Sequence, residues 1–400
     1  MTPETVATSL IDDLRAGHAK EAHARLGKTA SGAITPEALL QAWNGLATPL
    51  GEWKQTELTQ TAQQNGLTVF IHTVRFAKGG IETTTAVDPK TEKAEGFYLK
   101  ALTVPTAASY VKPETFTQDD VTVGNKPFAL PGTLTIPKGK GPFPSVVLVH
   151  GSGPNDRDEH IGANRPFKDL AEGLSSRGVI VLRYDKRTLT HGKDLVGKSV
   201  TMDDEVITDA LLAVDLLAAR KDVGKIFVVG HSLGALLAPE IAQRSKRVAG
   251  AVLLAPPARK PKEIILQQLR YVGAPAEKIA ETEKEFAKLE AGDPKAVVLG
   301  AAGSYWKEWE KKDGIAVAKK LKKPILVLRG TRDYQVNEDD FAAWKTGLEG
   351  VPNAAVLPVE KANHLFIEGE GKSMPAEYGV PGHVSADVIT RVAAFLTGAK

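Results

Sequence analysis

The sequence predicts an α/β fold: a doubly wound, mostly parallel sheet with an inserted helical lid, preceded by a small N-terminal α+β domain. Two observations lead to this prediction. Over residues 121–400, short continuous apolar runs alternate with segments of helical periodicity, which is typical of a parallel sheet covered by helices on both faces. Residues 1–105 instead carry two helical patterns followed by segments with a period of two, which indicates a separate α+β unit.

The N-terminal domain is predicted to cover residues 1–105. Residues 6–14 place Val6, Leu10 and Leu14 on one helical face, and Pro36 begins a second helix in its first turn. Alternating apolar residues then predict three strands, at residues 67–74, 81–87 and 96–102. Residues 106–120 are interpreted as a linker to the second domain.

The second domain, residues 121–400, is predicted to begin with a hairpin at residues 121–123 and 129–136. Parallel strands need crossover connections, and helical segments lie where these are required. Six apolar strands are expected at residues 145–149, 179–184, 225–229, 248–254, 325–328 and 354–359. Five helices are expected at residues 167–176, 202–220, 235–245, 338–347 and 385–396.

One interval between predicted strands is longer than a single crossover helix requires. Residues 256–321 form a charged stretch with helical periodicity, and we interpret them as an inserted lid. Its aromatic residues Tyr305, Trp306 and Trp309 fit two roles equally well. They can line an acyl or alcohol pocket as substrate-binding residues, or they can hold the lid onto the body of the domain.

Composition excludes several classes of function. The formal net charge of +3 is small and dispersed, so no nucleic-acid partner is predicted. The chain has no cysteine, which excludes thiol nucleophiles and disulfides. The sequence has no metal-ligand spacing and no complete nucleotide loop, so we expect no metal and no cofactor. No apolar run approaches the roughly 18 residues of a membrane span. The first residues do not read as a signal peptide, and both a cytoplasmic and an exported location stay open.

The most informative motif is residues 230–234, which read Gly-His-Ser-Leu-Gly directly after an apolar run. A strand that turns sharply into a helix at G-x-S-x-G exposes the serine hydroxyl at the end of the sheet, beside the helix N-terminus. Glycines are needed at both ends because so tight a turn leaves no room for side chains. Ser232 is therefore the candidate nucleophile.

A serine nucleophile needs a base, and the base needs a carboxylate to orient it. Asp333 and His364 each follow a predicted strand, at the carboxyl edge where active sites of open α/β sheets lie. The chain order serine, aspartate, histidine is a known order for such a triad. Asp339 and Asp340 begin the next helix, where acidic residues are ordinary, and His383 lies beyond the last strand. We therefore predict Asp333 as the acid and His364 as the base.

A tetrahedral intermediate carries a negative oxygen, which needs hydrogen-bond donors placed in advance. One expected donor is the backbone N–H of Leu233, the residue after the nucleophile. The other is expected from residues 150–154, which read His-Gly-Ser-Gly-Pro after an early strand. We predict the N–H of Ser152, with that of Gly151 as the second choice. His231 is expected to pack around the site and contact the substrate.

Residues 155–160 and 183–187 are dense in charge. We interpret them as ion-paired segments that meet at the carboxyl edge of the sheet and brace the site. A part in substrate recognition is the alternative.

Taken together, these motifs resemble those of bacterial serine α/β-hydrolases of the esterase type. The resemblance covers residues 121–400 and rests on the segments that begin at His150, Arg183, Gly230, Arg329 and Asn363. Residues 1–105 resemble the small NTF2-like domain of unknown function that often precedes such hydrolases. The resemblance implies carboxylesterase activity on short to medium acyl esters and frequent export.

The hypothesis from the sequence is a serine carboxylesterase whose partner is a small-molecule ester. Peptidases, thioesterases and acyltransferases use the same triad, so these activities stay open. A non-catalytic binding protein on the same fold is the alternative from another class. The N-terminal domain is expected to pair into a homodimer or to gate the active site. Acyl length, stereoselectivity and natural substrate are not determined at this stage.

Overall fold

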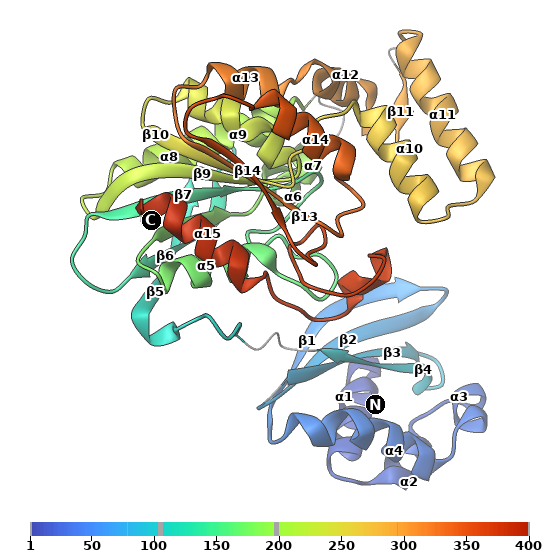
Figure 1. Cartoon of the computed structure of the whole chain (residues 1–400). Coiled ribbons are helices and arrows are strands. Elements are labelled where there is room, and N and C mark those ends of the chain that lie inside the picture. Colours follow the sequence, from blue (N-terminus) through green and yellow to red (C-terminus); the bar gives the residue numbers. More distant parts are fainter. Residues whose placement is uncertain (1, 78, 103–106, 196–199, 294, 399–400) are drawn as a thin grey trace. The chain divides into compact units, whose positions relative to one another are not determined.

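The computed structural model describes residues 2–77, 79–102, 107–195, 200–293 and 295–398. The chain divides into two compact units, Met1–Thr106 and Ala107–Lys400. Figure 1 shows the first unit in blue and the second from cyan to red. Each unit has its own sheet and its own hydrophobic core, so each is described by itself.

The first unit packs helices on one face of an antiparallel sheet in the order β1-β2-β3-β4. The threonines Thr2 and Thr35 cap two of the helices by accepting backbone N–H groups in the first turn, and a proline follows each. The core gathers Leu10, Trp43 and Ile81 with their neighbours. The helices are α1 (Pro3–Arg15), α2 (Ala19–Ala24), α3 (Lys28–Ala33) and α4 (Pro36–Ala47), with the 3-10 turn η1 (Thr48–Leu50). The strands are β1 (Trp53–Gln64), β2 (Leu67–Phe76), β3 (Gly79–Asp88) and β4 (Lys93–Leu102).

This sheet has four strands rather than the three predicted. The additional strand, β1, is rich in Thr and Gln and is exposed along nearly all of its length at the edge of the sheet. A strand with no buried face has no alternation of apolar and polar residues, so the pattern that identified the other strands is missing here.

The second unit contains an eight-stranded sheet in the order β14-β13-β10-β9-β7-β8-β6-β5. The pairs β5–β6 and β6–β8 are antiparallel, and the other neighbouring pairs are parallel. This confirms the predicted doubly wound, mostly parallel sheet. The strands are β5 (Phe116–Val123), β6 (Leu130–Pro137), β7 (Phe143–Val149), β8 (Ile180–Tyr184), β9 (Val223–His231), β10 (Val248–Leu254), β13 (Ile325–Gly330) and β14 (Ala354–Val359).

The segment interpreted as a linker is in part structured. Residues 107–120 belong to the second unit, and Phe116 already begins β5, which pairs with β6 along its whole length. The central residues of β5 are exposed at the edge of the sheet, so their polar sequence did not indicate a strand.

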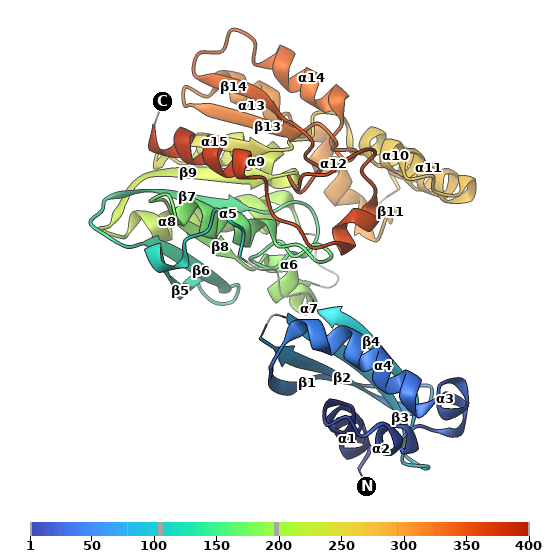
Figure 2. The same ribbon diagram turned by 60° about the horizontal axis from the view of Figure 1, so that its bottom comes forward.

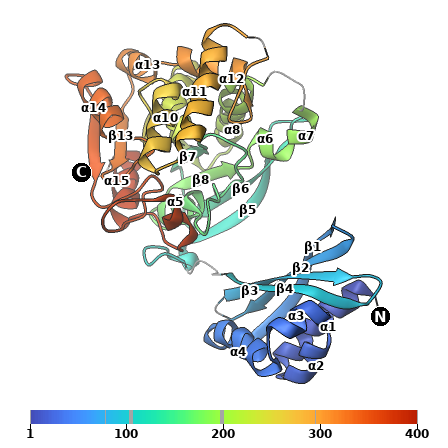
Figure 3. The same ribbon diagram turned by 90° about the vertical axis from the view of Figure 1, so that its right-hand side faces the viewer.

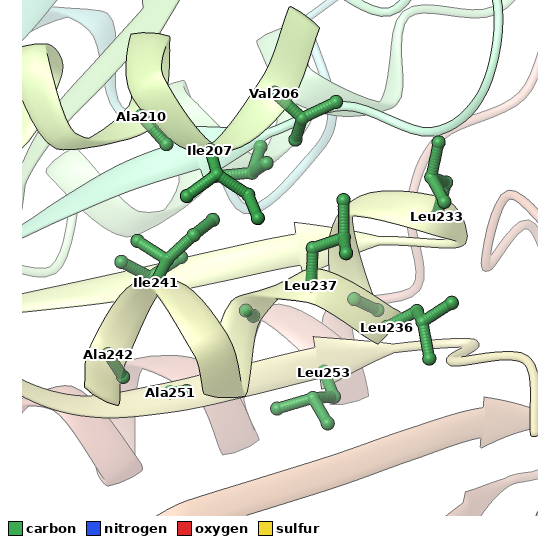
Figure 4. Close-up of a cluster of buried hydrophobic side chains, with 14 of the residues drawn as sticks. Val206, Ile207, Ala210, Leu233, Leu236, Leu237, Ile241, Ala242, Ala251 and Leu253 are labelled. Carbon is green, nitrogen blue, oxygen red and sulfur yellow. The ribbon is translucent and has the colours of Figure 1, made fainter. Parts of the chain in front are cut away.

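Helices cover both faces of this sheet and enclose two separate cores. Successive residues of a strand point to opposite faces, and β7 shows it: Val146 and Leu148 lie in one core, and Val147 and Val149 in the other. Helices α5 (Pro166–Ser175) and α15 (Ala386–Thr397) cover one face (Figure 2). Helices α8 (Thr208–Ala218), α9 (Leu233–Arg244), α13 (Gly314–Lys320) and α14 (Glu338–Gly347) contribute to the other core. Figure 4 shows part of that core, with Leu237 and Ile241 of α9 close to Ile207.

The insertion before β13 consists of helices α10 (Pro261–Tyr271), α11 (Ala276–Glu290) and α12 (Gly303–Lys311). Helices α10 and α11 lie side by side (Figures 1 and 3). Helix α13 packs on α9 and α14, so it is the crossover helix of the sheet rather than part of the insertion. The short elements of this unit are η2 (Pro113–Thr115), α6 (Arg187–Thr190), α7 (Gly192–Leu195), the π-helical turn η3 (Asp203–Ile207), β11 (Val297–Val298), β12 (Ala301–Ala302) and η4 (Pro375–Gly379).

Within the ranges described above, no helix combines the length and the apolar character that crossing a membrane requires.

The packing of α9 on the sheet leads to a stability prediction. Ile241 is fully buried, so Ile241→Ala should lower the free energy of unfolding of the second unit by about 2–5 kcal/mol, because a cavity replaces packed atoms. Leu212→Ala on α8 is the matched control, since Leu212 is 37% exposed, and it should change stability by less than about 0.5 kcal/mol. Urea denaturation followed by circular dichroism measures both. Equal losses would contradict this account of the core.

Candidate active site

The turn between β9 and α9 has the geometry of a nucleophile elbow. Ser232 has φ 52° and ψ −116°, a conformation that costs a non-glycine residue energy. A Cβ on Gly230 would lie 2.2 Å from the carbonyl oxygen of Gly234, and a Cβ on Gly234 would lie 2.2 Å from that of Val149. No side chain fits at either position. The turn therefore requires both glycines and presents the serine at the start of α9.

The predicted acid and base are in direct contact. Nδ1 of His364 lies 2.7 Å from Oδ2 of Asp333, and both residues are buried. The other carboxylate oxygen, Oδ1, accepts the backbone N–H groups of Gln335 (2.8 Å) and Val336 (3.0 Å). A carboxylate held in this way only accepts, so Nδ1 of His364 carries the proton. Nε2 is then left with its lone pair, as a base requires.

Ser232 and His364 open onto one cavity of about 260 Å³. The structure thus brings together the three residues predicted from separate motifs, with Asp333 behind the histidine. The cavity is lined by Gly151, Ser152, Asn155, Glu159, Ile161, His231, Ser232, Tyr334, Gln335, His364 and Tyr378.

Of the two predicted oxyanion donors, Ser152 borders this cavity. Leu233 is the first residue of α9, where backbone N–H groups have no partner within the helix. The loop is held from its carbonyl side: Nζ of Lys186 donates to the oxygen of Gly151 (2.8 Å), and Nδ2 of Asn155 to that of Ser152 (3.0 Å). The prediction of Gly151 as the second-choice oxyanion donor is corrected, because its N–H already donates to Oε1 of the buried Glu159 at 2.7 Å.

Comparison with known proteins identifies the family of the chain. The model of the alpha/beta hydrolase family matches residues 146–378, which is more than half of the chain. The chain belongs to this family.

One relative and two solved structures illustrate what this hydrolase is similar to. Esterase EstD of Thermotoga maritima is 43% identical over 368 residues, which cover 91% of this chain and 88% of EstD. Est1E from Butyrivibrio proteoclasticus is 17% identical, with a TM-score of 0.46 over 70% of this chain and 98% of that one. The Pyrococcus furiosus esterase Pf2001 is 20% identical, with a TM-score of 0.47 over 71% of this chain and 90% of that one.

The aromatic residues predicted to line the hydrolase's substrate pocket lie elsewhere. Trp306 and Trp309 are stacked with their ring centroids 5.8 Å apart, and Tyr305 meets both edge-on. Nε1 of Trp306 donates to the carbonyl oxygen of Val298. These rings pack into the core that includes α9, and none lines the catalytic cavity. The amphipathic pattern of α12 therefore reflects attachment of the insertion to the body, which was the alternative role.

Two tyrosines that sequence reasoning missed line the cavity instead, Tyr334 and Tyr378. Tyr271 of α10 stacks on Tyr334 with centroids 4.7 Å apart, so the insertion reaches the site through this contact. Burial raises the pKa of both Tyr334 and Tyr378, so their phenols remain protonated at neutral pH. Tyr334 directly follows the predicted acid in the sequence, and that position was a signal that it lies near the site. Tyr378 lies in the short 3-10 turn η4, and its sequence position gave no such signal.

His231 lines the cavity but is occupied by protein groups, which corrects its predicted role in binding substrate. Its Nε2 lies 2.9 Å from the carbonyl oxygen of His364, and its Nδ1 lies 2.9 Å from Oε2 of Glu159. With both nitrogens engaged, its ring has no polar atom to offer a substrate.

The charged segments form the predicted braces at the carboxyl edge. Arg157 makes two side-chain hydrogen bonds to Asp185, and Arg183 pairs with Asp158 at 2.8 Å.

Burial lowers the pKa of the neighbouring His150 to about 4, so this histidine is neutral and packs as a structural residue. In the described part of the chain, no three His, Asp or Glu side chains gather as metal ligands.

The contact between acid and base leads to a mutational prediction. Asp333→Asn should slow labelling of Ser232 by a fluorophosphonate about 10³-fold or more, because an amide favours the wrong histidine tautomer. Asp339→Asn is the matched control. That carboxylate is 71% exposed, and labelling should stay within about twofold of the wild type. Time courses read by mass spectrometry give both rates, and comparable labelling of the two variants would contradict the assignment of the acid.

Proposed function

We propose that this hydrolase is a serine carboxylesterase that cleaves short- to medium-chain carboxylic esters through an acyl-enzyme on Ser232. The observation that carries the proposal is the hydrogen-bonded pair of Asp333 and His364, with His364 opening onto the same cavity as a serine on a nucleophile elbow. The 43% identity with esterase EstD over most of both chains supports an ester as the substrate.

In the proposed mechanism, Oγ of Ser232 attacks the ester carbonyl while Nε2 of His364 takes its proton. The negative oxygen that forms is held by the backbone N–H groups of Ser152 and Leu233. His364, oriented by Asp333, then donates its proton to the leaving alcohol, and the acyl group remains on the serine. Water enters, gives a proton to the same histidine and attacks the acyl-enzyme. The acid leaves and the proton returns to Ser232.

The dimensions of the cavity support short acyl groups. Its volume of about 260 Å³ lies below the roughly 300–1,000 Å³ of pockets that enclose drug-sized ligands. The phenols of Tyr334 and Tyr378 and the amide of Gln335 give its wall both apolar area and hydrogen-bonding groups.

A panel of p-nitrophenyl esters with acyl chains from about two to sixteen carbons tests this function. We expect the highest kcat/KM at short chains, and loss of turnover in Ser232→Ala to background. Ser152→Ala is the matched control. It keeps the backbone N–H and should keep activity within a few fold, because the proposed donor is that N–H and not the side chain.

Two outcomes of the panel would contradict the proposal. Turnover that persists in Ser232→Ala would exclude an acyl-enzyme on this serine. A folded wild type that cleaves no ester of the panel but cleaves thioesters or peptides would assign the triad to one of those substrates.

We propose further that the first unit pairs two copies of the chain. Strand β1 lies at the edge of its sheet, is twelve residues long and exposes two large apolar side chains, Trp53 and Leu58. A long exposed edge strand presents unpaired backbone groups that can pair with a second copy.

Light scattering coupled to size exclusion tests the dimer. The wild type should have twice the mass of one chain, and Leu58→Lys should move the mass toward that of one chain, because a lysine on an edge strand opposes pairing. Leu357→Lys is the matched control on β14, where Leu357 is 39% exposed in the second unit. A monomeric wild type would exclude the dimer, and a shift in the control alone would assign the interface to the second unit.

A further inference from the structure

A buried carboxylate and a buried histidine connect three parts of the active site. Glu159 lies on the loop that follows β7, is 1% exposed and has φ 51°, which is unusual for a non-glycine residue. Its Oε1 accepts the N–H of Gly151 at 2.7 Å. Its Oε2 lies 2.9 Å from Nδ1 of His231, the residue directly before the nucleophile. The carboxylate therefore joins the oxyanion loop to the nucleophile elbow.

The histidine extends the connection to the catalytic base. Nε2 of His231 lies 2.9 Å from the carbonyl oxygen of His364. A carbonyl only accepts a hydrogen bond, so this nitrogen carries a proton. Nδ1 lies 2.9 Å from the carboxylate oxygen Oε2 of Glu159 as an ion pair without the angle of a hydrogen bond, and the negative charge favours a proton there as well. With both nitrogens protonated, the ring of His231 is a cation paired with Glu159.

The surroundings of the pair agree with this charge state. Burial alone would lower the pKa of His231, but the Glu159 carboxylate and the His364 carbonyl raise it above the usual histidine value. Burial would raise the pKa of Glu159, but His231 and the Gly151 N–H hold it below its usual range. The other titratable groups that face the pair are His150, Asp333 and the ring of His364, whose centroid is 4.7 Å from that of His231.

We propose that Glu159 and His231 form a charged positioning pair that holds the oxyanion loop and the loop of the catalytic base in register with Ser232. The pair touches no reacting atom and acts through Gly151 and the main chain of His364. This inference rests on the proposed function, because it assigns a role within that reaction.

The pair matters for rate because the groups it connects come from different strands. The oxyanion loop follows β7, the nucleophile follows β9 and the base follows β14. Small relative shifts of such groups are costly, since a misplacement of about 1 Å can slow an enzymatic reaction about 100-fold. Loss of the negative charge on Glu159 removes the second proton of His231 and replaces the ion pair at Nδ1 by a neutral contact, which holds the ring less strongly.

Two substitutions test the pair. Glu159→Gln keeps an oxygen for the N–H of Gly151 and removes the charge, and His231→Gln keeps an amide nitrogen near the position of Nε2 while removing the cation. Asp209→Asn is the matched control, because Asp209 is also fully buried and pairs with a cation, Arg187, and neither residue lines the catalytic cavity.

The readout is kcat on the best short-chain ester, counted per active site titrated to completion with a fluorophosphonate. We expect Glu159→Gln to lower kcat per site about 10- to 100-fold with KM within about threefold. His231→Gln should retain more activity than His231→Ala, because its amide can still donate to the His364 carbonyl. Counting per titrated site removes the contribution of unfolded protein, and Asp209→Asn should leave kcat per site unchanged.

A spectroscopic signature tests the charge state directly. In ¹⁵N-histidine NMR, the resonance that disappears in His231→Gln should report a doubly protonated ring at pH 8 in the wild type, and a neutral ring in Glu159→Gln. A neutral His231 in the wild type would overturn the charged pair.

The kinetic outcomes also separate this inference from the proposed function. An active wild type with kcat per site within about threefold in Glu159→Gln would overturn the positioning role alone, as would an equal loss in Asp209→Asn. A wild type that neither cleaves esters nor reacts with the fluorophosphonate would instead overturn the proposed function.

Discussion

The proposed active site of this hydrolase depends on a backbone turn that has no room for side chains on either side. Gly230 and Gly234 approach carbonyl oxygens so closely that a Cβ at either position would overlap them. The tight turn that these two glycines permit places Ser232 at φ 52° at the start of α9. The apolar packing of β9 and α9 stabilises this conformation, because both elements are buried and cannot relax independently.

The parallel sheet brings the remaining groups to the turn. Loops after β7, β13 and β14 leave the same edge, so residues about 30 and 130 positions from one another meet at one cavity. Hydrogen bonds then fix the positions of the loop residues more closely than the strands do. Asp333 accepts two backbone N–H groups, and Lys186 and Asn155 hold the carbonyl side of the oxyanion loop. Lys186 is buried and follows β8, so its hydrogen bond fixes the oxyanion loop after β7 relative to a loop from the neighbouring strand.

The insertion contributes to the site in a different way from the one predicted. Its aromatic helix α12 packs into the core, whereas α10 reaches the catalytic loop by stacking Tyr271 on Tyr334 and by hydrogen bonds from Gln267 and Gln268. The wall of the cavity therefore depends on how α10 lies against the loop after β13. Changes in the insertion can alter the cavity without touching the triad.

The sequence by itself determined the layered fold and indicated Ser232, Asp333 and His364, because continuous apolar strands and a glycine-bounded turn leave a local pattern. It did not reveal β1, whose polar residues bury no face, or that β5, predicted only over residues 121–123, begins within the expected linker at the edge of the sheet. The place of Tyr378 in the cavity wall and the partnership of Glu159 with His231 were decided only by tertiary structure, and Tyr334 had only its position beside the predicted acid as a signal. Their roles come from contacts between segments far apart in the chain, and no local periodicity encodes such contacts.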